Sequence, residues 1–260
     1  MTLRLPLAFG VGSLCILAQP ALTQQPSTAP AVASTAVITP EIRTALDRMV
    51  SAMKAPQSLE FKADLTSEEV LTDGQKIQSS STMTASARRP DRLYLDVASK
   101  RRNRQFFYDG KNLTVYGPVN KYYVSVPAPP TTAEMLKQVD ERYGVETPLL
   151  DVFEWAVTGV NLDKVTSAMA AGTDTIGGKA CDQFAFRQES VDWQLWIPQT
   201  EPALPCKLVI TDTVDPSHPA FSAVFNWTSA PQLGDDRFNF VAPQGAKRIS
   251  LDTAKEVTRK

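Results

Sequence analysis

The chain has 260 residues, a formal net charge of −1 and a hydrophobic content of 43%. It contains one histidine and three cysteines, which excludes metal sites built from several imidazole or thiolate ligands. Since no basic stripe or acidic tail stands out, we expect no nucleic-acid partner. No metal is expected because ligands are lacking, and no cofactor is expected because no glycine-rich phosphate loop is present.

The N-terminus has the pattern of an export signal. Arg4 is the only charge before Glu41, and residues 5–18 are almost wholly apolar, a run that is too short to span a membrane. Small residues follow, so we predict a signal peptide over residues 1–23, cleaved near Thr23. Loss of Arg4 takes the net charge from −1 to −2. A retained N-terminal anchor is the alternative, because the cleavage site is imperfect.

The rest of the chain divides by composition. Residues 24–39 contain Pro, Ala, Ser, Thr and Gln without a charge, which is typical of a flexible linker. Residues 40–253 are long enough for one domain with its own core, and residues 254–260 form a short C-terminal tail.

The first predicted element is a helix, and strands follow it. Thr39-Pro40 is a good helix start, and an apolar stripe at helical spacing continues to about residue 55. From residue 57 to 127 apolar and polar residues alternate, which predicts about six antiparallel strands. Asp73-Gly74 and Asp109-Gly110 are expected as two-residue hairpin turns. The first turn leaves the apolar faces out of step, so we expect a β-bulge near residues 67–69.

The middle of the chain is predicted to be helical. Thr131 and Glu134 form a capping box before one helix, which should end at Gly144. Thr147-Pro148 should start a second helix. Strands resume after residue 159, with Gly177-Gly178 as a hairpin turn and residues 237–241 as a candidate fifth strand of this half.

About eleven antiparallel strands cannot form a flat sheet, because strand twist makes a long sheet curl. The concave apolar face must be covered, and three amphipathic helices are available. We therefore predict an α+β domain with a strongly curved antiparallel sheet, an incomplete β-barrel. The N-terminal helix and the two mid-chain helices would serve as a lid over a packed core or a cavity.

Cys181 and Cys206 remain after cleavage, and in an oxidising compartment such a pair predicts a disulfide. However, the predicted strand 191–197 lies between the strands that they open. Strands two apart are separated by about 9–10 Å, which is beyond disulfide reach. The bond therefore forms only if the middle strand stops short; otherwise both residues are buried thiols.

The order of elements resembles the lipoprotein-carrier fold shared by LolA, LolB and the mycobacterial LppX-type proteins. In detail the chain resembles an uncharacterised family of predicted periplasmic proteins with that fold. The likeness covers most of residues 40–250 and is carried by strand-and-turn motifs: RRPDRLYLDV (88–97), FFYDGKNLTVY (106–116), KYYVSVPAP (121–129), RYGVETPLLDVFEW (142–155) and VDWQLWI (191–197). The resemblance implies a periplasmic half-barrel with a hydrophobic cavity.

Strand alternation gives the side chains that would line such a cavity. They are expected to be Phe61, Leu65, Leu93, Leu95, Phe106, Leu113, Val115, Tyr122, Val124, Phe184, Phe186, Leu195, Leu208, Ile210 and Phe225. The lid would contribute Met135, Leu136, Val139, Leu150 and Phe153. The alternative is that all of these side chains simply pack against one another.

The polar residues give little sign of catalysis. Ser217 and His218 are adjacent in one short loop and cannot easily face each other as nucleophile and base, so no catalytic residue is expected. Arg88, Arg89 and Arg92 cluster with Asp91 at a strand start. They would hold a lid closed, meet a lipid head group, or form a surface cluster with weak ion pairs.

The sequence thus predicts a periplasmic, non-enzymatic binding or carrier protein, a monomer that holds an acyl chain, a lipid or a lipidated peptide. An envelope membrane protein is a further expected partner. The alternative is an envelope sensor or scaffold that uses the same fold without a transported ligand.

Overall fold

The computed structural model describes residues 38–100, 103–143 and 149–250. The predicted signal peptide, most of the linker and the C-terminal tail therefore lie outside the described residues. The described elements are α1 (Pro40–Lys54), β1 (Ser58–Val70), β2 (Lys76–Arg88), β3 (Arg92–Ser99), β4 (Asn103–Tyr108), β5 (Asn112–Gly117), β6 (Tyr122–Pro127), α2 (Thr132–Tyr143), α3 (Leu150–Trp155), β7 (Ser167–Ile176), β8 (Lys179–Arg187), β9 (Val191–Pro198), β10 (Lys207–Asp212), β11 (Ala220–Trp227), the 3-10 helix η1 (Asp235–Arg237) and β12 (Lys247–Arg248).

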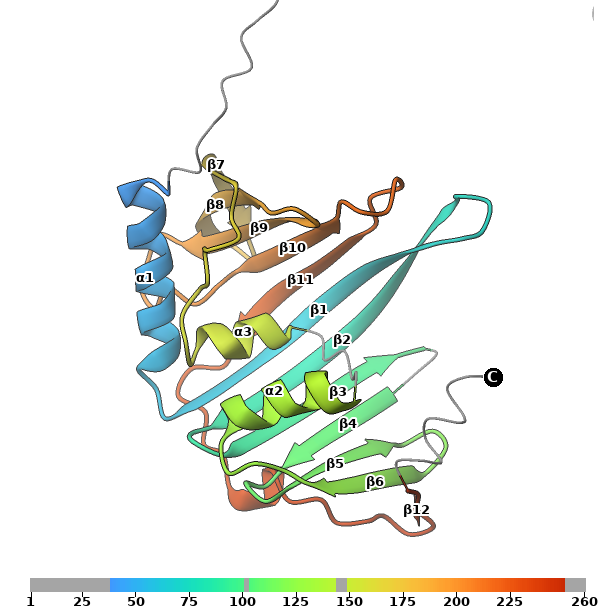
Figure 1. The fold of residues 1–260 in the computed structure, drawn as a ribbon. Helices are drawn as coiled ribbons and strands as arrows, with labels where there is room; N and C mark the ends of the chain where they lie inside the picture. Colours follow the sequence, from blue (N-terminus) through green and yellow to red (C-terminus); the bar gives the residue numbers. More distant parts are fainter. Residues whose placement is uncertain (1–37, 101–102, 144–148, 251–260) are drawn as a thin grey trace, which may run out of the picture. The chain divides into compact units, whose positions relative to one another are not determined.

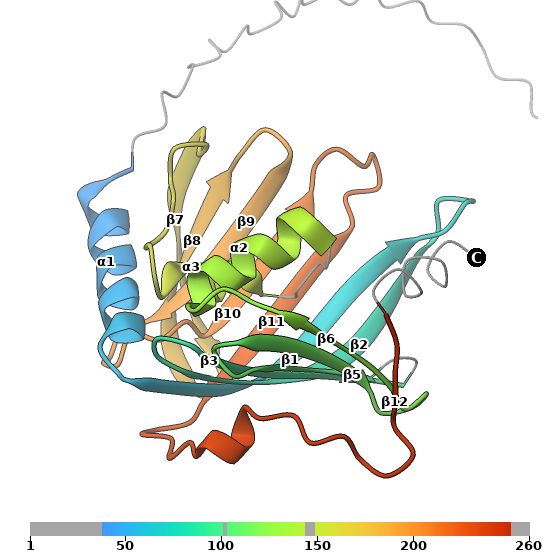
Figure 2. The ribbon, with the colours of Figure 1, turned by 60° about the horizontal axis from the view of Figure 1, so that its bottom comes forward.

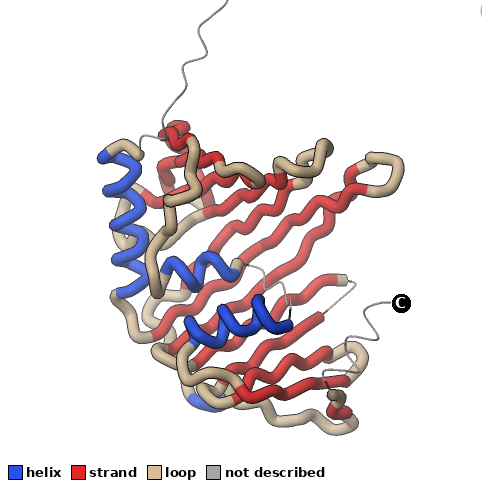
Figure 3. The backbone as a smooth tube through the Cα atoms, in the orientation of Figure 1, coloured by secondary structure: helices blue, strands red, loops and turns tan. Residues whose placement is uncertain are grey.

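All of these strands belong to one sheet, in the order β12-β6-β5-β4-β3-β2-β1-β11-β10-β9-β8-β7. The sheet is open and strongly curved, and α1, α2 and α3 lie on its concave side (Figures 1 and 2). Figure 3 shows the same helices against the continuous run of strands. The predicted α+β architecture is confirmed, with twelve strands in place of about eleven.

Helices α1 and α2 begin where the sequence predicts, whereas the predicted helix end at Gly144 and helix start at Thr147-Pro148 lie outside the described residues. The Thr39 hydroxyl accepts a hydrogen bond from the Ile42 N–H at the start of α1, and Pro40 occupies the first turn. Thr131 likewise accepts from the Glu134 N–H before α2, at 3.3 Å. Among the described residues, no helix combines the length and the apolar character that a membrane crossing requires.

The β1–β2 hairpin differs from the prediction in its turn. Val70 pairs with Lys76, so five residues connect the strands instead of two. Pairing then runs without a shift to Ser58 and Arg88, so the predicted bulge is wrong. The observed register differs by one residue from the predicted one, and a one-residue slip exchanges the faces of a strand. The apolar faces therefore match without a bulge.

The β4–β5 hairpin shows a smaller difference. Tyr108 pairs with Leu113 instead of Lys111, because the turn contains four residues. The Asp109 carboxylate accepts hydrogen bonds from the Lys111 and Asn112 N–H groups, and Gly110 adopts a φ of 84°. A two-residue shift keeps every side chain on its predicted face, because the side-chain period of a strand is two.

The second half of the sheet contains the predicted glycine turn. Ile176 pairs with Lys179, so Gly177 and Gly178 are the two loop residues, and both have positive φ. This geometry matches a hairpin turn that glycine adopts without strain. Residues 237–241 do not form a strand, and this prediction is wrong.

Instead, residues 230–248 form a C-terminal strap that crosses the convex side of the sheet (Figure 2). Phe240 lies among three rings of that face, 5.3 Å from Phe107, 5.4 Å from Tyr116 and 5.0 Å from Tyr123 between centroids. The strap ends as β12, which pairs in parallel with β6 and is the strand that the sequence did not predict.

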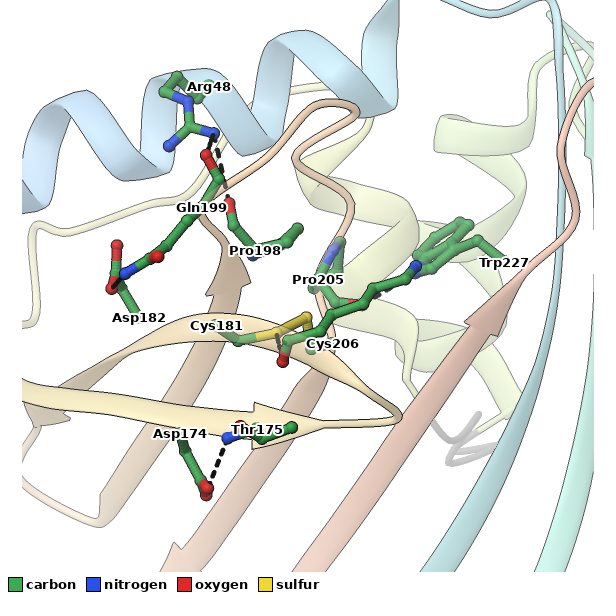
Figure 4. The surroundings of a disulfide bond; sticks show 11 residues. Arg48, Asp174, Thr175, Cys181, Asp182, Pro198, Gln199, Pro205, Cys206 and Trp227 are labelled. Atoms are coloured by element: carbon green, nitrogen blue, oxygen red, sulfur yellow. Dashed lines mark hydrogen bonds between the residues drawn. A yellow bond between two sulfur atoms is a disulfide. The ribbon is translucent and has the colours of Figure 1, made fainter.

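Cys181 and Cys206 form a disulfide, with their Cα atoms 6.8 Å apart (Figure 4). The intervening strand β9 ends at Pro198, which pairs with Cys181, and Cys206 lies just before β10. β9 therefore reaches the level of both cysteines and ends there. The predicted bond forms, but the condition set for it, a middle strand that stops short of the cysteines, is wrong. Trp196 packs against both cysteines in a small second core.

Replacing both cysteines by alanine should lower the free energy of unfolding by about 3 kcal/mol, because the bond closes a loop between residues 25 positions apart. Urea denaturation measures this change. A reducing agent should destabilise the wild type by a similar amount and leave the double variant unaffected. Equal stability of the oxidised wild type and the variant would contradict the prediction.

Candidate functional site

The concave face of the sheet is apolar, and its rings meet those of the helices. Phe61 on β1 lies 6.0 Å from Phe153 on α3 and 5.4 Å from Phe225 on β11. Further along the sheet, Phe186 stacks on Trp193 at 3.8 Å. The alternation of β1, β8, β9 and β11 turns these rings to the same side, as the sequence predicted.

Most of the predicted lining residues are buried in one core cluster with α1, α2 and α3. The buried members are Phe61, Leu65, Leu93, Leu95, Phe106, Leu113, Phe184, Phe186, Leu195, Leu208 and Phe225. Val115 and Ile210 are partly buried against this cluster, and Val124 is half-buried on β6. Tyr122, at the start of β6, is 41% exposed.

The predicted lid residues come from two helices that contact each other. Met135 and Leu136 of α2 and Phe153 of α3 are buried in the same core cluster. Val139 and Leu150 lie outside the residues whose side chains the structure describes. The described lid side chains therefore fill space over the concave face.

Two hollows border the described residues. One, of about 550 Å³, lies beside the middle of β1 and β2 and the end of β3, and Leu65 contributes to it. The other, of about 1100 Å³, lies between α1 and the loops 201–204 and 228–231. Of the predicted lining residues, Leu65 alone borders either hollow.

The β2–β3 turn (residues 88–92) joins the helices to the sheet. The Arg89 guanidinium donates hydrogen bonds to the carbonyl oxygens of Met53 (2.8 Å), Lys54 (2.9 Å) and Pro56 at the end of α1. It also donates to the Ala156 carbonyl oxygen that follows α3, at 3.2 Å. One cation thus connects the C-terminal ends of two helices, where helix dipoles favour positive charge.

The same turn also holds α2 and the strap. The Pro90 carbonyl oxygen accepts from the Thr132 N–H at the first residue of α2, at 3.0 Å. Arg88 forms an ion pair with Asp235 and donates to the Leu233 carbonyl oxygen at 2.9 Å. The bases of both lid helices therefore lie at this turn, and α2 and α3 extend away from it over the sheet (Figure 1).

These contacts bear on the three readings of the arginine cluster. Arg89 binds backbone carbonyls at the ends of α1 and α3, which favours the role of holding the lid closed, while Arg88 binds the strap on the other face. Arg92 pairs with Asp91 at 2.9 Å, as a local ion pair. Gly110 packs against this pair so closely that a Cβ atom there would lie 2.6 Å from the Arg92 Nη1 atom.

Burial determines the electrostatics of the site. Desolvation lowers the pKa of the half-buried Arg89. Tyr108 is fully buried on β4, and its hydroxyl donates to the Pro129 carbonyl oxygen at 2.5 Å, just before α2. Burial, and next the negative charge of Asp91, raise the pKa of Tyr108 to about 12.

Ser217 and His218, which were considered as a nucleophile and a base, form hydrogen bonds within their own loop. The His218 Nδ1 atom lies 3.2 Å from the Asp212 carbonyl oxygen, and the Asp215 carboxylate accepts from the Ser217 N–H at 2.8 Å. These bonds shape the β10–β11 loop. Within the described part of the chain, no three His, Cys, Asp or Glu residues are grouped so that they could hold a metal ion.

Sequence reasoning missed three features of the structure. The cover on the convex face by Phe240 depends on contacts between distant segments, for which the sequence carries no local signal. The bond from Thr132 to Pro90 joins backbone atoms, which are the same in every residue type. The outer groove beside α1 was also missed, because loops 201–204 and 228–231 meet only in the fold.

Residues 43–252 match the family described as "Predicted periplasmic protein (DUF2092)", and the chain belongs to this family. The family and the periplasmic localisation predicted from the sequence are thereby confirmed. No protein with a curated description matches the chain in sequence.

Solved structures are similar to this chain at low sequence identity. The lipoprotein LppX of Mycobacterium tuberculosis has 14% identity and a TM-score of 0.48, over 75% of this chain and 99% of that one. LprF of Mycobacterium bovis has 16% identity and a TM-score of 0.43, over 80% and 99%. A conserved protein of Thermus thermophilus has 11% identity and a TM-score of 0.46, over 81% and 99%.

Replacement of Arg89 by methionine should lower the free energy of unfolding by about 2–3 kcal/mol, because several backbone carbonyls lose a charged donor. Hydrogen exchange should also speed up in α3. Arg43→Met, at an exposed position of α1, is the matched control and should have little effect. Similar stability of the two variants in urea would show that the Arg89 bonds contribute nothing.

Tyr108 should make stability fall at alkaline pH. Its pKa is raised in the fold, so its contribution is complete below about pH 10 and is lost as pH rises towards 12. Between pH 8 and pH 11 the free energy of unfolding should therefore fall by about 1 kcal/mol less in Tyr108→Phe than in wild type. Tyr122→Phe, at an exposed tyrosine, should lose as much as wild type. Denaturant titrations at both pH values provide the test, and parallel losses in all three proteins would refute it.

Proposed function

We propose that this member of the periplasmic family is a non-enzymatic binding or carrier protein for a hydrophobic ligand: an acyl chain, a lipid or a lipidated peptide. One observation carries the proposal. Among the described residues, α2 and α3 are the helices that cover the middle of the apolar concave sheet face, and they have 12 and 6 residues and are fastened at their bases. Such a cover can move without disturbing the strands.

The ligand would occupy the concave face after α2 and α3 move aside. It would contact the predicted lining residues and replace the side chains of Met135, Leu136 and Phe153. Burial of a methylene contributes about 0.8 kcal/mol, so a 14-carbon chain could gain roughly 10 kcal/mol before entropy losses. This gain can offset the lost helix contacts without any charged partner. An envelope membrane protein would then deliver or receive the ligand.

A second function, an envelope sensor or scaffold, is favoured by another observation. In this structure the helices fill the concave face, as the contact of Phe61 with Phe153 illustrates. If α2 and α3 do not move away from the concave face, the protein would act through its outer surfaces. In that case the rings and aliphatic side chains serve stability alone.

Two measurements distinguish the two functions: native mass spectrometry and solvent extraction of the protein purified from the periplasm of the cells that express it. A carrier should retain a lipid or an acylated compound. An empty protein that also ignores acyl probes would favour the scaffold and refute the carrier.

A variant tests the moving cover directly. Phe153→Ala removes a ring that lies between α3 and β1 and should increase the binding of the apolar dye N-phenyl-1-naphthylamine several-fold. Val157→Ala, at a position that is 45% exposed just after α3, should leave dye binding unchanged. Equal dye binding by both variants would argue against a cover that gives access to the concave face.

A further inference from the structure

The groove beside α1 lies outside the core and needs no helix movement to be reached. One wall is formed by α1 and the start of β1, and the other is built by the loops 201–204 and 228–231. The lining residues are Thr44, Asp47, Arg48, Ser51, Ala52, Ala55, Pro56, Ser58, Leu59, Glu201, Pro202, Leu204, Thr228, Ser229, Ala230 and Pro231. Its volume of about 1100 Å³ is at the upper end of small-molecule sites, roughly 300–1,000 Å³.

The lining has the composition of a site for an amphiphile. Ala52, Ala55 and Pro56 on the α1 side face Pro202 and Leu204 on the loop side, and none of them carries a polar side chain. Because these side chains are short or rigid, they leave space along the helix. An apolar chain that enters this space loses contact with water and breaks no hydrogen bond.

Three charged residues line the groove, one cation and two carboxylates. The Arg48 Nε atom donates to Glu201 at 2.9 Å, and Asp47 precedes Arg48 on the same helix. The Glu201 side chain is 65% exposed, so this ion pair is open to exchange with a ligand. A groove that offers one cation and two carboxylates complements a head group that carries both a phosphate and an ammonium group.

The wall that carries Glu201 is held in place. Arg48 also donates to the carbonyl oxygens of Pro198 (3.3 Å) and Gln199 (3.2 Å), as Figure 4 shows for Gln199. The loop closes at Cys206, which the disulfide ties to Cys181. The backbone on both sides of Glu201 is therefore anchored, while the Glu201 side chain remains exposed.

We infer that the groove between α1 and the loops 201–204 and 228–231 binds a single-chain amphiphile with a zwitterionic phosphate–ammonium head group. The phosphate would pair with Arg48, the ammonium group with Asp47 and Glu201, and the acyl chain would lie along Ala52 and Ala55. The inference rests on the proposed function for its ligand class. It adds a site that is accessible while α2 and α3 cover the concave face.

Titration of the purified protein with lysophosphatidylethanolamine of 14 carbons, below its micelle concentration, tests the site by calorimetry. Ala52→Phe fills the groove and should weaken binding at least tenfold, while Lys54→Phe, on the same helix outside the groove, should leave it within about twofold. Arg48→Gln should weaken binding about tenfold and Arg43→Gln should not. Thermal denaturation confirms that each variant is folded.

The outcomes separate this inference from the proposed function. If wild type binds the lipid and Ala52→Phe binds it equally well, the groove is not the site, while the carrier function stands. If myristate binds as tightly as the lysophospholipid, the assignment of the head group is wrong. If wild type binds neither, the inference is overturned, and the extraction experiment above decides the carrier function by itself.

Discussion

The Arg89 guanidinium lies where the C-terminal ends of α1 and α3 approach the sheet. The arrangement of the helices on the sheet depends on this cation. Backbone carbonyls at a helix C-terminus lack partners within the helix and carry partial negative charge. Arg89 supplies hydrogen-bond donors to the end of α1 and to the residue after α3. Because Pro90 binds the start of α2, one turn of five residues fixes the positions of all three helices.

This fixed turn divides the sheet into surfaces with different roles. On the concave side, helix side chains cover an apolar face and are held at the base of each lid helix. On the convex side, the strap covers the aromatic residues of β3 to β6, with Phe240 at its centre. Arg88 binds the strap and Arg89 binds the helices, so neighbouring residues of one turn secure opposite faces.

The sequence allowed the faces of the strands to be predicted better than their pairing. Alternation identifies the buried side of a strand whatever its neighbour, so Phe106 and Leu113 lie on the predicted face although the turn between them was misjudged. Turn length depends on local hydrogen bonds such as those of Asp109, which a dipeptide pattern does not reveal. The strap and the Arg89 contacts escaped prediction because they join segments far apart in the chain.

The two candidate binding surfaces differ in what a ligand must displace. On the concave face, an acyl chain competes with Met135, Leu136 and Phe153, so its affinity is the difference between two similar burial energies. Beside α1, the apolar lining is already exposed, and the ligand displaces water and one exposed ion pair. An amphiphile should therefore occupy the outer groove more readily than the concave face. Occupancy of the concave face depends on whether the hydrogen bonds at the β2–β3 turn allow α2 and α3 to move.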